Sequence, residues 1–138
     1  RQHLDHWLPE VDMMLQPYLS QVETFGETSA IYFGGQLSHA VRKIPVAGDY
    51  RVQDTFGAAD VAYQLTAAEM AQSQACLQYL EQNHPEVLYA RFDFLHDKTG
   101  HVYLNEAELI EPSLFFNHGG QAAELFAQKI LSFLSDDH

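Results

Sequence analysis

The residues best suited to chemistry lie in two neighbouring segments that read as strands. Arg91 and Asp93 lie two residues apart in the first segment, and Glu106 and Glu108 lie two residues apart in the second. Because side chains alternate along a strand, each pair is expected to lie on one face of its strand. The face predicted for the two glutamates also carries Val102, Leu104 and Ile110. Grouped carboxylates offer the hard oxygen ligands that Mg²⁺ prefers.

The pairing register decides whether the two strands present their acids together. A loop of four residues, 97–100, places Arg91 opposite Glu106 and Asp93 opposite Leu104, with all the charged side chains on one face. A slip of one residue changes these partners. With Arg91 as their neutralising partner, the carboxylates are expected to repel one another in the absence of a ligand. The alternative is a solvated acidic strand edge with an Arg91–Glu106 pair, and spacing alone leaves both open.

A second cluster is basic. Arg42, Lys43 and Arg51 are three of the seven Lys and Arg residues, and they fall within ten positions that also contain Gly48. Cations beside glycine-containing turns suggest an anionic ligand such as nucleotide phosphates. Pairing with surplus surface acids is the alternative.

Length and charge exclude several classes of protein. The chain has 138 residues, enough for one core, and a formal net charge of −12. Such a surface repels phosphate backbones and anionic membranes, so we expect neither nucleic acid nor a membrane as partner. The single cysteine, Cys76, excludes an internal disulfide and fits a reducing, cytoplasmic location. No apolar run approaches the roughly 20 residues that a membrane helix needs.

Two segments are predicted to be helices. Thr66 and Glu69 form a capping-box pattern that begins a helix, which should end near His84, before Pro85. A second helix is predicted after Gly119 and Gly120, with an apolar face at three-to-four spacing. The predicted apolar positions are Ala68, Ala71, Ala75, Cys76, Tyr79 and Leu80 in the first helix, and Ala123, Phe126, Ile130, Phe133 and Leu134 in the second.

Alternation with a period of two predicts strands elsewhere. Segments 29–33 and 36–41 flank the pair Gly34-Gly35 and predict one hairpin, and segments 88–94 and 101–110 predict another. Segment 11–18 is compatible with a strand or a short helix. The expected fold is therefore α+β, with a mostly antiparallel sheet and the two helices packed on one face.

The ordered string of motifs resembles the ATP-grasp ligases, in the branch of bacterial glutathione synthetase and the ribosomal-protein glutamate ligases. The matching pieces are 14–18 (MLQPY), 26–29 (GETS), 38–43 (SHAVRK), 48–53 (GDYRVQ), 89–94 (YARFDF) and 105–116 (NEAELIEPSLFF). The resemblance begins near Val11 and implies the C-terminal lobe of an ATP-grasp domain over residues 1–138. A substrate-binding domain, the phosphate-binding lysine strand and the glycine-rich loop are expected upstream of Arg1.

The resemblance also implies roles for particular residues. Asp93, Glu106 and Glu108 look like the Mg²⁺ ligands that bridge the ATP phosphates. Arg42 and Arg51 look like the cations that hold the γ-phosphate and the acyl phosphate. The segment around Gln16 looks like the hinge that meets adenine and ribose.

The sequence departs from the family pattern at two places. The family usually ends its metal strand with Glu-x-Asn, where this chain has Glu106 and Glu108, so Asn105, Glu106, Glu108 and Glu111 all stay candidates for completing the site. The usual Gly-Gly after the Arg51 segment is Gly57-Ala58 in this chain.

The expected function is ATP-dependent ligation of a small-molecule or peptide carboxylate to an amine or thiol, with ATP and Mg²⁺ bound by this chain. The sequence is compatible with a homo-oligomer, and the isolated chain is expected to be inactive. The rival interpretation is a non-enzymatic acidic module that binds a partner or divalent cations.

Overall fold

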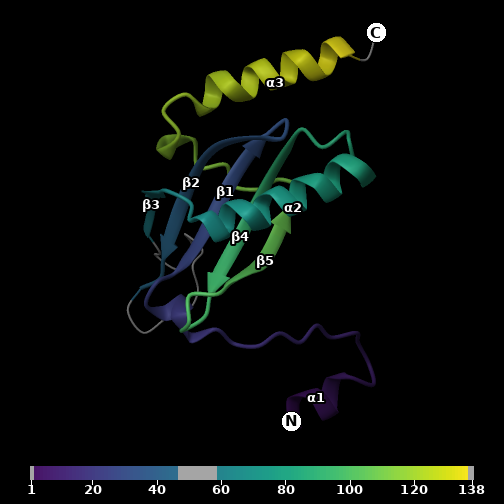
Figure 1. Ribbon diagram of the computed structural model, residues 1–138. Coiled ribbons are helices and arrows are strands. Elements are labelled where there is room, and N and C mark those ends of the chain that lie inside the picture. The colour runs from purple at the N-terminus through teal and green to yellow at the C-terminus, as the bar shows by residue number, and fades with distance from the viewer. Residues whose placement is uncertain (1, 47–58, 137–138) are drawn as a thin grey trace.

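The computed structural model describes residues 2–46 and 59–136 and has an α+β fold built on a five-stranded antiparallel sheet (Figure 1). This confirms the predicted fold class. In chain order the elements are α1 (Gln2–Trp7), a 3₁₀ turn (Ser20–Glu23), β1 (Glu27–Phe33), β2 (Gln36–Ile44), β3 (Ala59–Tyr63), α2 (Ala67–Asn83), β4 (Tyr89–His96), β5 (Val102–Glu108), another 3₁₀ turn (Phe116–His118) and α3 (Ala122–Asp136).

The sheet is formed from two hairpins joined along β1 and β4. The strands lie in the order β3-β2-β1-β4-β5. Both predicted hairpins are confirmed, since β1 pairs with β2 and β4 pairs with β5. Gly34 and Gly35 make the first turn with φ angles of 50° and 73°, which side chains disfavour. Every residue of β1 is buried, as its central place in the sheet requires.

The two long helices pack on opposite faces of the sheet, which corrects the prediction that they share one. The core under α2 contains Ala30 and Tyr32 of β1, and the core under α3 contains the alternate residues Ile31 and Phe33. The helix residues at these contacts are Cys76, Leu77 and Leu80 in α2, and Ala122, Leu125 and Phe126 in α3. A helix pattern shows that one face must be buried, but it does not say on which side of the sheet.

The predicted capping box at the start of α2 is confirmed. The Glu69 amide donates to the Thr66 hydroxyl at 3.3 Å, and the Thr66 amide donates to the Glu69 carboxylate at 2.7 Å. The same carboxylate is fully buried and accepts hydrogen bonds from the hydroxyls of Thr28 and Tyr63. Burial, followed by the charge of Glu69, raises the pKa of Tyr63 to about 12. One carboxylate therefore begins the helix and ties it to β1 and β3.

The inward face of α2 differs from the predicted apolar stripe. It runs through Glu69, Ser73, Cys76, Leu77 and Leu80, whereas the side chains of several predicted positions are exposed. The exposed positions are Ala68, Ala71, Ala75 and Tyr79. This rotation buries the larger side chains of Leu77 and Leu80 and leaves small alanines in solvent, while the Glu69 carboxylate meets its hydroxyl partners.

A β-bulge in β5 corrects the predicted register. His96 pairs with Val102, and Asp93 pairs with Glu106, so one extra residue, Asn105, is accommodated between these pairs. The turn between the paired residues His96 and Val102 spans five residues, 97–101, rather than four, and a hydrogen bond from Asp97 N to the carbonyl of His101 at 3.0 Å closes it. Two predicted cross-strand pairs are therefore wrong. Arg91 lies opposite Glu108 instead of Glu106, and Asp93 lies opposite Glu106 instead of Leu104.

The bulge also separates apolar and acidic residues that alternation had placed on one face. Val102 and Leu104 pair with His96 and Phe94 and lie on the α2 face of the sheet. Beyond the bulge, the two glutamates of β5 pair with Arg91 and Asp93 and lie on the opposite face. The face of β5 that was predicted to mix apolar and acidic residues is therefore split, with its apolar residues on one side of the sheet and its glutamates on the other.

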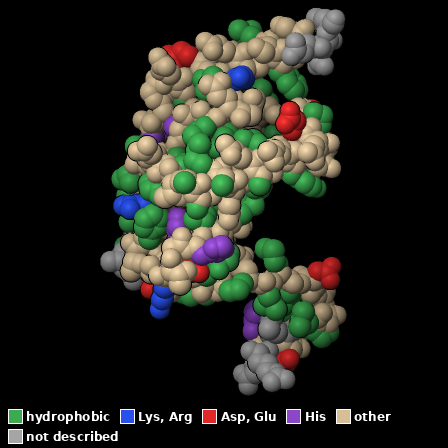
Figure 2. Space-filling model, viewed as in Figure 1, with side chains coloured by type: hydrophobic (Ala, Val, Ile, Leu, Met, Phe, Trp, Pro, Cys, Tyr) green, Lys and Arg blue, Asp and Glu red, His purple; other side chains and the backbone are tan. Residues whose placement is uncertain are grey.

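The N-terminal segment is irregular and protrudes from the body (Figures 1 and 2). Residues 11–18 are neither strand nor helix, and they are followed by the 3₁₀ turn Ser20–Glu23. Trp7, Leu8 and Met14 are exposed in this segment. In the described part of the chain, no helix combines the length and apolar character needed to cross a membrane.

The connection from β5 to α3 is held against β2 by His39. Its Nε2 lies 3.0 Å from the carbonyl of Leu114 and 3.1 Å from that of Phe115, and its Nδ1 lies 2.9 Å from the hydroxyl of Ser38. Since carbonyls only accept, Nε2 carries the proton and Nδ1 accepts from the serine. Burial lowers the pKa of His39, although the two carbonyl contacts oppose this shift.

His39 is expected to make stability depend on pH. Its pKa is lower in the folded chain than its ordinary 6.5, so the unfolded chain binds more protons near and below that pH. The stability that neutral His39 contributes is complete above about pH 6.5 and is lost as the pH falls. Urea unfolding of the wild type and His39→Gln at pH 7.5 and 5.5 should therefore converge at the lower pH. The exposed His84→Gln is the control, and equal convergence in both variants would contradict this role.

Candidate active site

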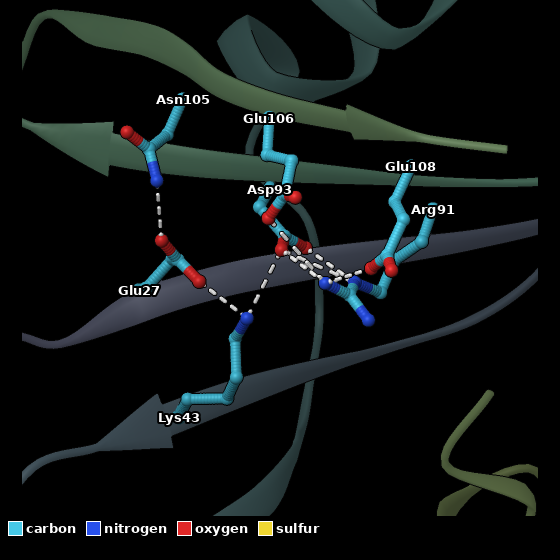
Figure 3. Close-up of polar contacts among 7 residues, drawn as sticks. All are labelled: Glu27, Lys43, Arg91, Asp93, Asn105, Glu106 and Glu108. Atoms are coloured by element: carbon cyan, nitrogen blue, oxygen red, sulfur yellow. Dashed lines mark hydrogen bonds and ion pairs between the residues drawn. The ribbon is translucent and has the colours of Figure 1, made fainter. Parts of the chain in front are cut away.

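Seven polar residues form a connected cluster on the sheet face opposite α2 (Figure 3). They come from four strands, and the bulged residue of β5 is one of them. The members are Glu27 in β1, Lys43 in β2, Arg91 and Asp93 in β4, and Asn105, Glu106 and Glu108 in β5. The antiparallel pairing of β2, β1, β4 and β5 places these side chains side by side across the sheet.

Asp93 is the buried centre of the cluster, with an exposed fraction of 0%. Arg91 donates to it through Nε at 3.0 Å and Nη2 at 2.8 Å, and Lys43 donates at 3.1 Å. Burial by itself would raise the pKa of Asp93, but the charges of Lys43 and Arg91 outweigh it, so this pKa lies below its ordinary value. Asp93 is therefore held as a carboxylate between two cations.

Glu27 is a member of the cluster that the sequence reasoning did not identify. It is 5% exposed, forms an ion pair with Lys43 and accepts a hydrogen bond from Asn105 Nδ2 at 2.8 Å. Burial raises the pKa of Glu27 more than the charge of Lys43 lowers it. The sequence signal that could have identified Glu27 is its position directly after Gly26. Glu27 is the first residue of β1, and it pairs there with Lys43.

Arg91 contacts all three of the predicted metal ligands. Its Nη2 lies 2.8 Å from Asp93, 2.5 Å from Glu108 and 3.6 Å from Glu106. The side chains of Glu108 and Glu106 are 28% and 53% exposed, so the cluster opens toward solvent on the β5 side. The prediction that Arg91, Asp93, Glu106 and Glu108 share one face is confirmed.

Arg42 does not lie with the cluster. It is adjacent to Lys43 in β2 and points to the other face of the sheet, where its guanidinium lies 5.2 Å from the centre of the Phe25 ring. Its positive charge acts on Tyr63, which also lies on the α2 face. Among the residues of β2, Lys43 is therefore the cation that contacts the carboxylates of the cluster. Arg51, the other predicted phosphate-binding cation, lies outside the described residues.

Gln16 reaches the cluster from the N-terminal segment. Its Nε2 donates to Asn105 Oδ1 at 2.9 Å. A cavity of about 230 Å³ opens beside this contact, and its lining is mostly apolar. The residues that line it are Gln16, Pro17, Leu19, Leu95, Tyr103, Leu104 and Asn105. Asn105 thus links the cavity to Glu27, whereas the remaining candidate, Glu111, lies exposed beyond the end of β5.

The donor set suits Mg²⁺ by its chemistry. Carboxylate oxygens on an open face are the ligands this ion takes, and Asp93, Glu106 and Glu108 supply them. Within residues 2–46 and 59–136, however, no three His, Cys, Asp or Glu side chains converge closely enough to hold a metal ion. The cation that the three carboxylates surround is the guanidinium of Arg91.

Comparison with known proteins places this geometry in a family context. No protein-family model matches the chain. The cycloserine biosynthesis protein DcsG of Streptomyces lavendulae is 32% identical over 123 residues, which are 86% of this chain and 41% of DcsG. The crystal structure of the D-cycloserine synthetase DcsG matches with a TM-score of 0.68 at 26% identity, over 83% of this chain and 40% of that one.

A more distant likeness concerns the fold alone. The ATP-grasp ligase PsnB, solved with Mg, ADP and a phosphomimetic variant of its minimal precursor, has a TM-score of 0.52 at 17% identity. The match covers 86% of this chain and 35% of PsnB. The chain thus spans about two-fifths of the length of the relatives it matches. In sequence the chain is related to DcsG, and its fold is that of the ATP-grasp ligases.

Proposed function

We propose that the protein is an ATP-dependent ligase that joins a carboxylate to an amine or a thiol through an acyl phosphate. The observation that carries the proposal is the open cluster in which Lys43 and Arg91 lie among the carboxylates of Asp93, Glu106 and Glu108. Phosphoryl transfer needs fixed cations for phosphate oxygens and carboxylates for Mg²⁺, and both are present on one face.

The proposed reaction has two steps. The substrate carboxylate attacks the γ-phosphorus of ATP, so that ADP leaves and an acyl phosphate forms. The amine or thiol then attacks the acyl carbon, inorganic phosphate leaves, and the nucleophile loses its proton. When Mg²⁺ is bound, it offsets the charge of the phosphate oxygens.

In this reaction, the role of the cluster is to hold positive charge in fixed places for the phosphate oxygens. Lys43 is held by Glu27 and Asp93, and Arg91 is held by Asp93 through two nitrogens, so both cations are oriented before ATP arrives. A cation that needs no reorganisation stabilises the charge of the transferring phosphoryl group more than water does. Asp93, Glu106 and Glu108 are the residues that would hold Mg²⁺.

The cavity beside Asn105 is the proposed site for the adenine base. Its apolar lining suits the faces of a flat ring, and the amides of Gln16 and Asn105 lie at its rim as donors and acceptors. Gln16 also belongs to the segment that resembles the family hinge. The base would then lie one hydrogen-bonded residue, Asn105, away from the Glu27–Lys43 pair.

Comparing two neighbouring cations tests this proposal. Lys43→Met is expected to lower kcat/KM for ATP-dependent ligation by about 10²–10³-fold, the cost typical of losing one preorganised charge. Arg42→Met removes the same charge one residue away on the opposite sheet face and should cost less than about tenfold. Ligase rates and ATP affinities of the intact protein, with melting temperatures beside them, provide the measurement.

Two outcomes would contradict the proposal. If Arg42→Met costs more than Lys43→Met, phosphate lies on the α2 face, and the residues that resemble the family's cations act there. If neither variant changes ATP affinity or rate while divalent cations still bind, the cluster belongs to a non-enzymatic acidic module.

A further inference from the structure

The guanidinium of Arg91 occupies the centre of the carboxylate cluster. One nitrogen, Nη2, lies within 3.6 Å of oxygens from Asp93, Glu106 and Glu108, and Nε donates to Asp93 as well. These are the side chains that the proposed function assigns to Mg²⁺. A divalent cation and the guanidinium therefore compete for the same oxygens.

Lys43 and Arg91 differ in how firmly they are held. Both cations are buried, at 7% and 8% exposure, so the difference lies in their partners. Lys43 has a buried second partner in Glu27, which is itself fixed by Asn105. Two of the three partners of Arg91 are the glutamates of β5, which reach solvent. Breaking a solvent-exposed ion pair costs little compared with breaking a buried one. The contacts of Arg91 with Glu106 and Glu108 are thus the exchangeable ones, whereas its hydrogen bonds to Asp93 are buried.

The charges of the cluster also leave room for exchange. Glu27, Asp93, Glu106 and Glu108 carry four negative charges against the two positive charges of Lys43 and Arg91. The surplus of two negative charges attracts a divalent cation, while the position of Arg91 keeps the oxygens from converging on one. The same cluster therefore attracts a divalent cation by its net charge and keeps it out by the position of Arg91.

We propose that Arg91 is an internal counter-cation that opposes metal binding, and that it releases Glu106 and Glu108 when a divalent cation binds with nucleotide. This inference rests on the proposed function, in which Lys43 and Arg91 are the cations for the phosphate oxygens. A phosphate that pairs with Arg91 removes the competitor for the glutamates, so nucleotide and metal favour each other's binding. By linkage, the factor by which each raises the other's affinity is the same.

The proposal predicts that removing the charge of Arg91 raises the affinity for the metal alone and lowers the affinity for the nucleotide with metal. Without nucleotide, Arg91→Gln should bind Mn²⁺ about tenfold more tightly than the wild type, because a unit charge beside the dication is removed. The same variant should bind ATP with Mg²⁺ at least about tenfold more weakly, since the phosphate loses its cation. Lys98→Gln, a charge loss in the exposed turn after β4, is the matched control and should change both affinities less than twofold.

The experiment is a titration of the intact protein with Mn²⁺ alone, followed by electron paramagnetic resonance of the free ion, and a separate calorimetric titration with ATP and Mg²⁺. If Arg91→Gln binds Mn²⁺ no more tightly than Lys98→Gln does, the counter-cation role is overturned. If Mn²⁺ binding tightens but no variant or wild type binds ATP, the proposed function fails and the competition at Arg91 stands.

A measurement on the wild type covers the case in which Arg91→Gln does not fold. In protein with ¹⁵N-labelled arginine, the Nε–H signal of Arg91 should be slow to exchange with solvent and little affected by Mg²⁺ alone. It should shift when Mg²⁺ and ATP are added together. A signal that Mg²⁺ alone moves to its final position would overturn the proposal, because the metal would then displace Arg91 without help from phosphate.

Discussion

Asp93→Asn is expected to abolish ATP-dependent ligation and to lower the free energy of unfolding by about 3–5 kcal/mol. Asp93 is fully buried and is the shared partner of Lys43 and Arg91, so the amide takes from both cations the buried carboxylate that holds them together inside the sheet face. Its lowered pKa shows that the folded chain favours the carboxylate. Urea unfolding and ligase rates of the intact protein provide the measurement.

Glu108→Gln is the matched control for this prediction. Its side chain is partly exposed and shares Arg91 with two other carboxylates, so its loss should change the free energy of unfolding by less than about 1 kcal/mol. If Glu108 holds Mg²⁺ as proposed, ligation should still be lost. If Asp93→Asn keeps both its stability and its ligase activity, the buried carboxylate of Asp93 is not part of the active site.

This expectation replaces one that the sequence supports. With Arg91 as their neutralising partner, the carboxylates should repel, and removing one should be neutral or mildly stabilising. The structure adds Lys43 as a second cation on the same face and buries Asp93 between the two. Removing that charge therefore breaks a buried network instead of relieving repulsion.

Glu69→Ala is expected to lower the free energy of unfolding by about 3 kcal/mol or more. The substitution removes the capping box, worth about 1 kcal/mol, and leaves the buried hydroxyl of Thr28 without its acceptor, which costs a further 1–3 kcal/mol. Tyr63 loses the same acceptor, so β3 should loosen together with the start of α2. Urea unfolding followed by circular dichroism measures the change.

Glu81→Ala is the control on the same helix. Glu81 is exposed near the C-terminal end of α2, where a negative charge opposes the helix dipole, so its removal should be neutral or slightly stabilising. A loss below 1 kcal/mol in Glu69→Ala would mean that the carboxylate caps the helix without supporting the sheet. Since Glu69 lies on the face opposite Asp93, its loss should affect activity only through stability.

Local sequence signals predicted the elements that depend on neighbouring residues. The Gly34-Gly35 turn, the pairing of both hairpins and the capping box of α2 formed as predicted, although the register of the second hairpin did not, because turns and caps are decided within a few residues. Strand β3 was not predicted. Its five residues lie at the sheet edge beside β2, and their pairing with that strand is a long-range contact.

The site was predicted in part, and the errors come from strand register and from the faces of the strands. Alternation placed the acids of β4 and β5 on one face correctly. The longer turn, however, put Val102 and Leu104 on the other face, and the bulge at Asn105 returned Glu106 and Glu108 to the face of the β4 acids with new partners. The same alternation separates Arg42 from Lys43, and only knowledge of which face carries Asp93 shows that Lys43 is the cation that reaches it. A shift of one residue reverses the face of every side chain beyond it.

The sequence by itself determined the family resemblance, the α+β class and the acidic strand pair, because these depend on residue types and short spacings. The tertiary structure decided which charges meet. It brought Glu27 from the start of β1 to Lys43 and Asn105, put α2 and α3 on opposite faces, and surrounded the guanidinium of Arg91 with three carboxylates. Each of these arrangements depends on strand order, on register or on which face of the sheet an element covers, and local patterns do not encode these.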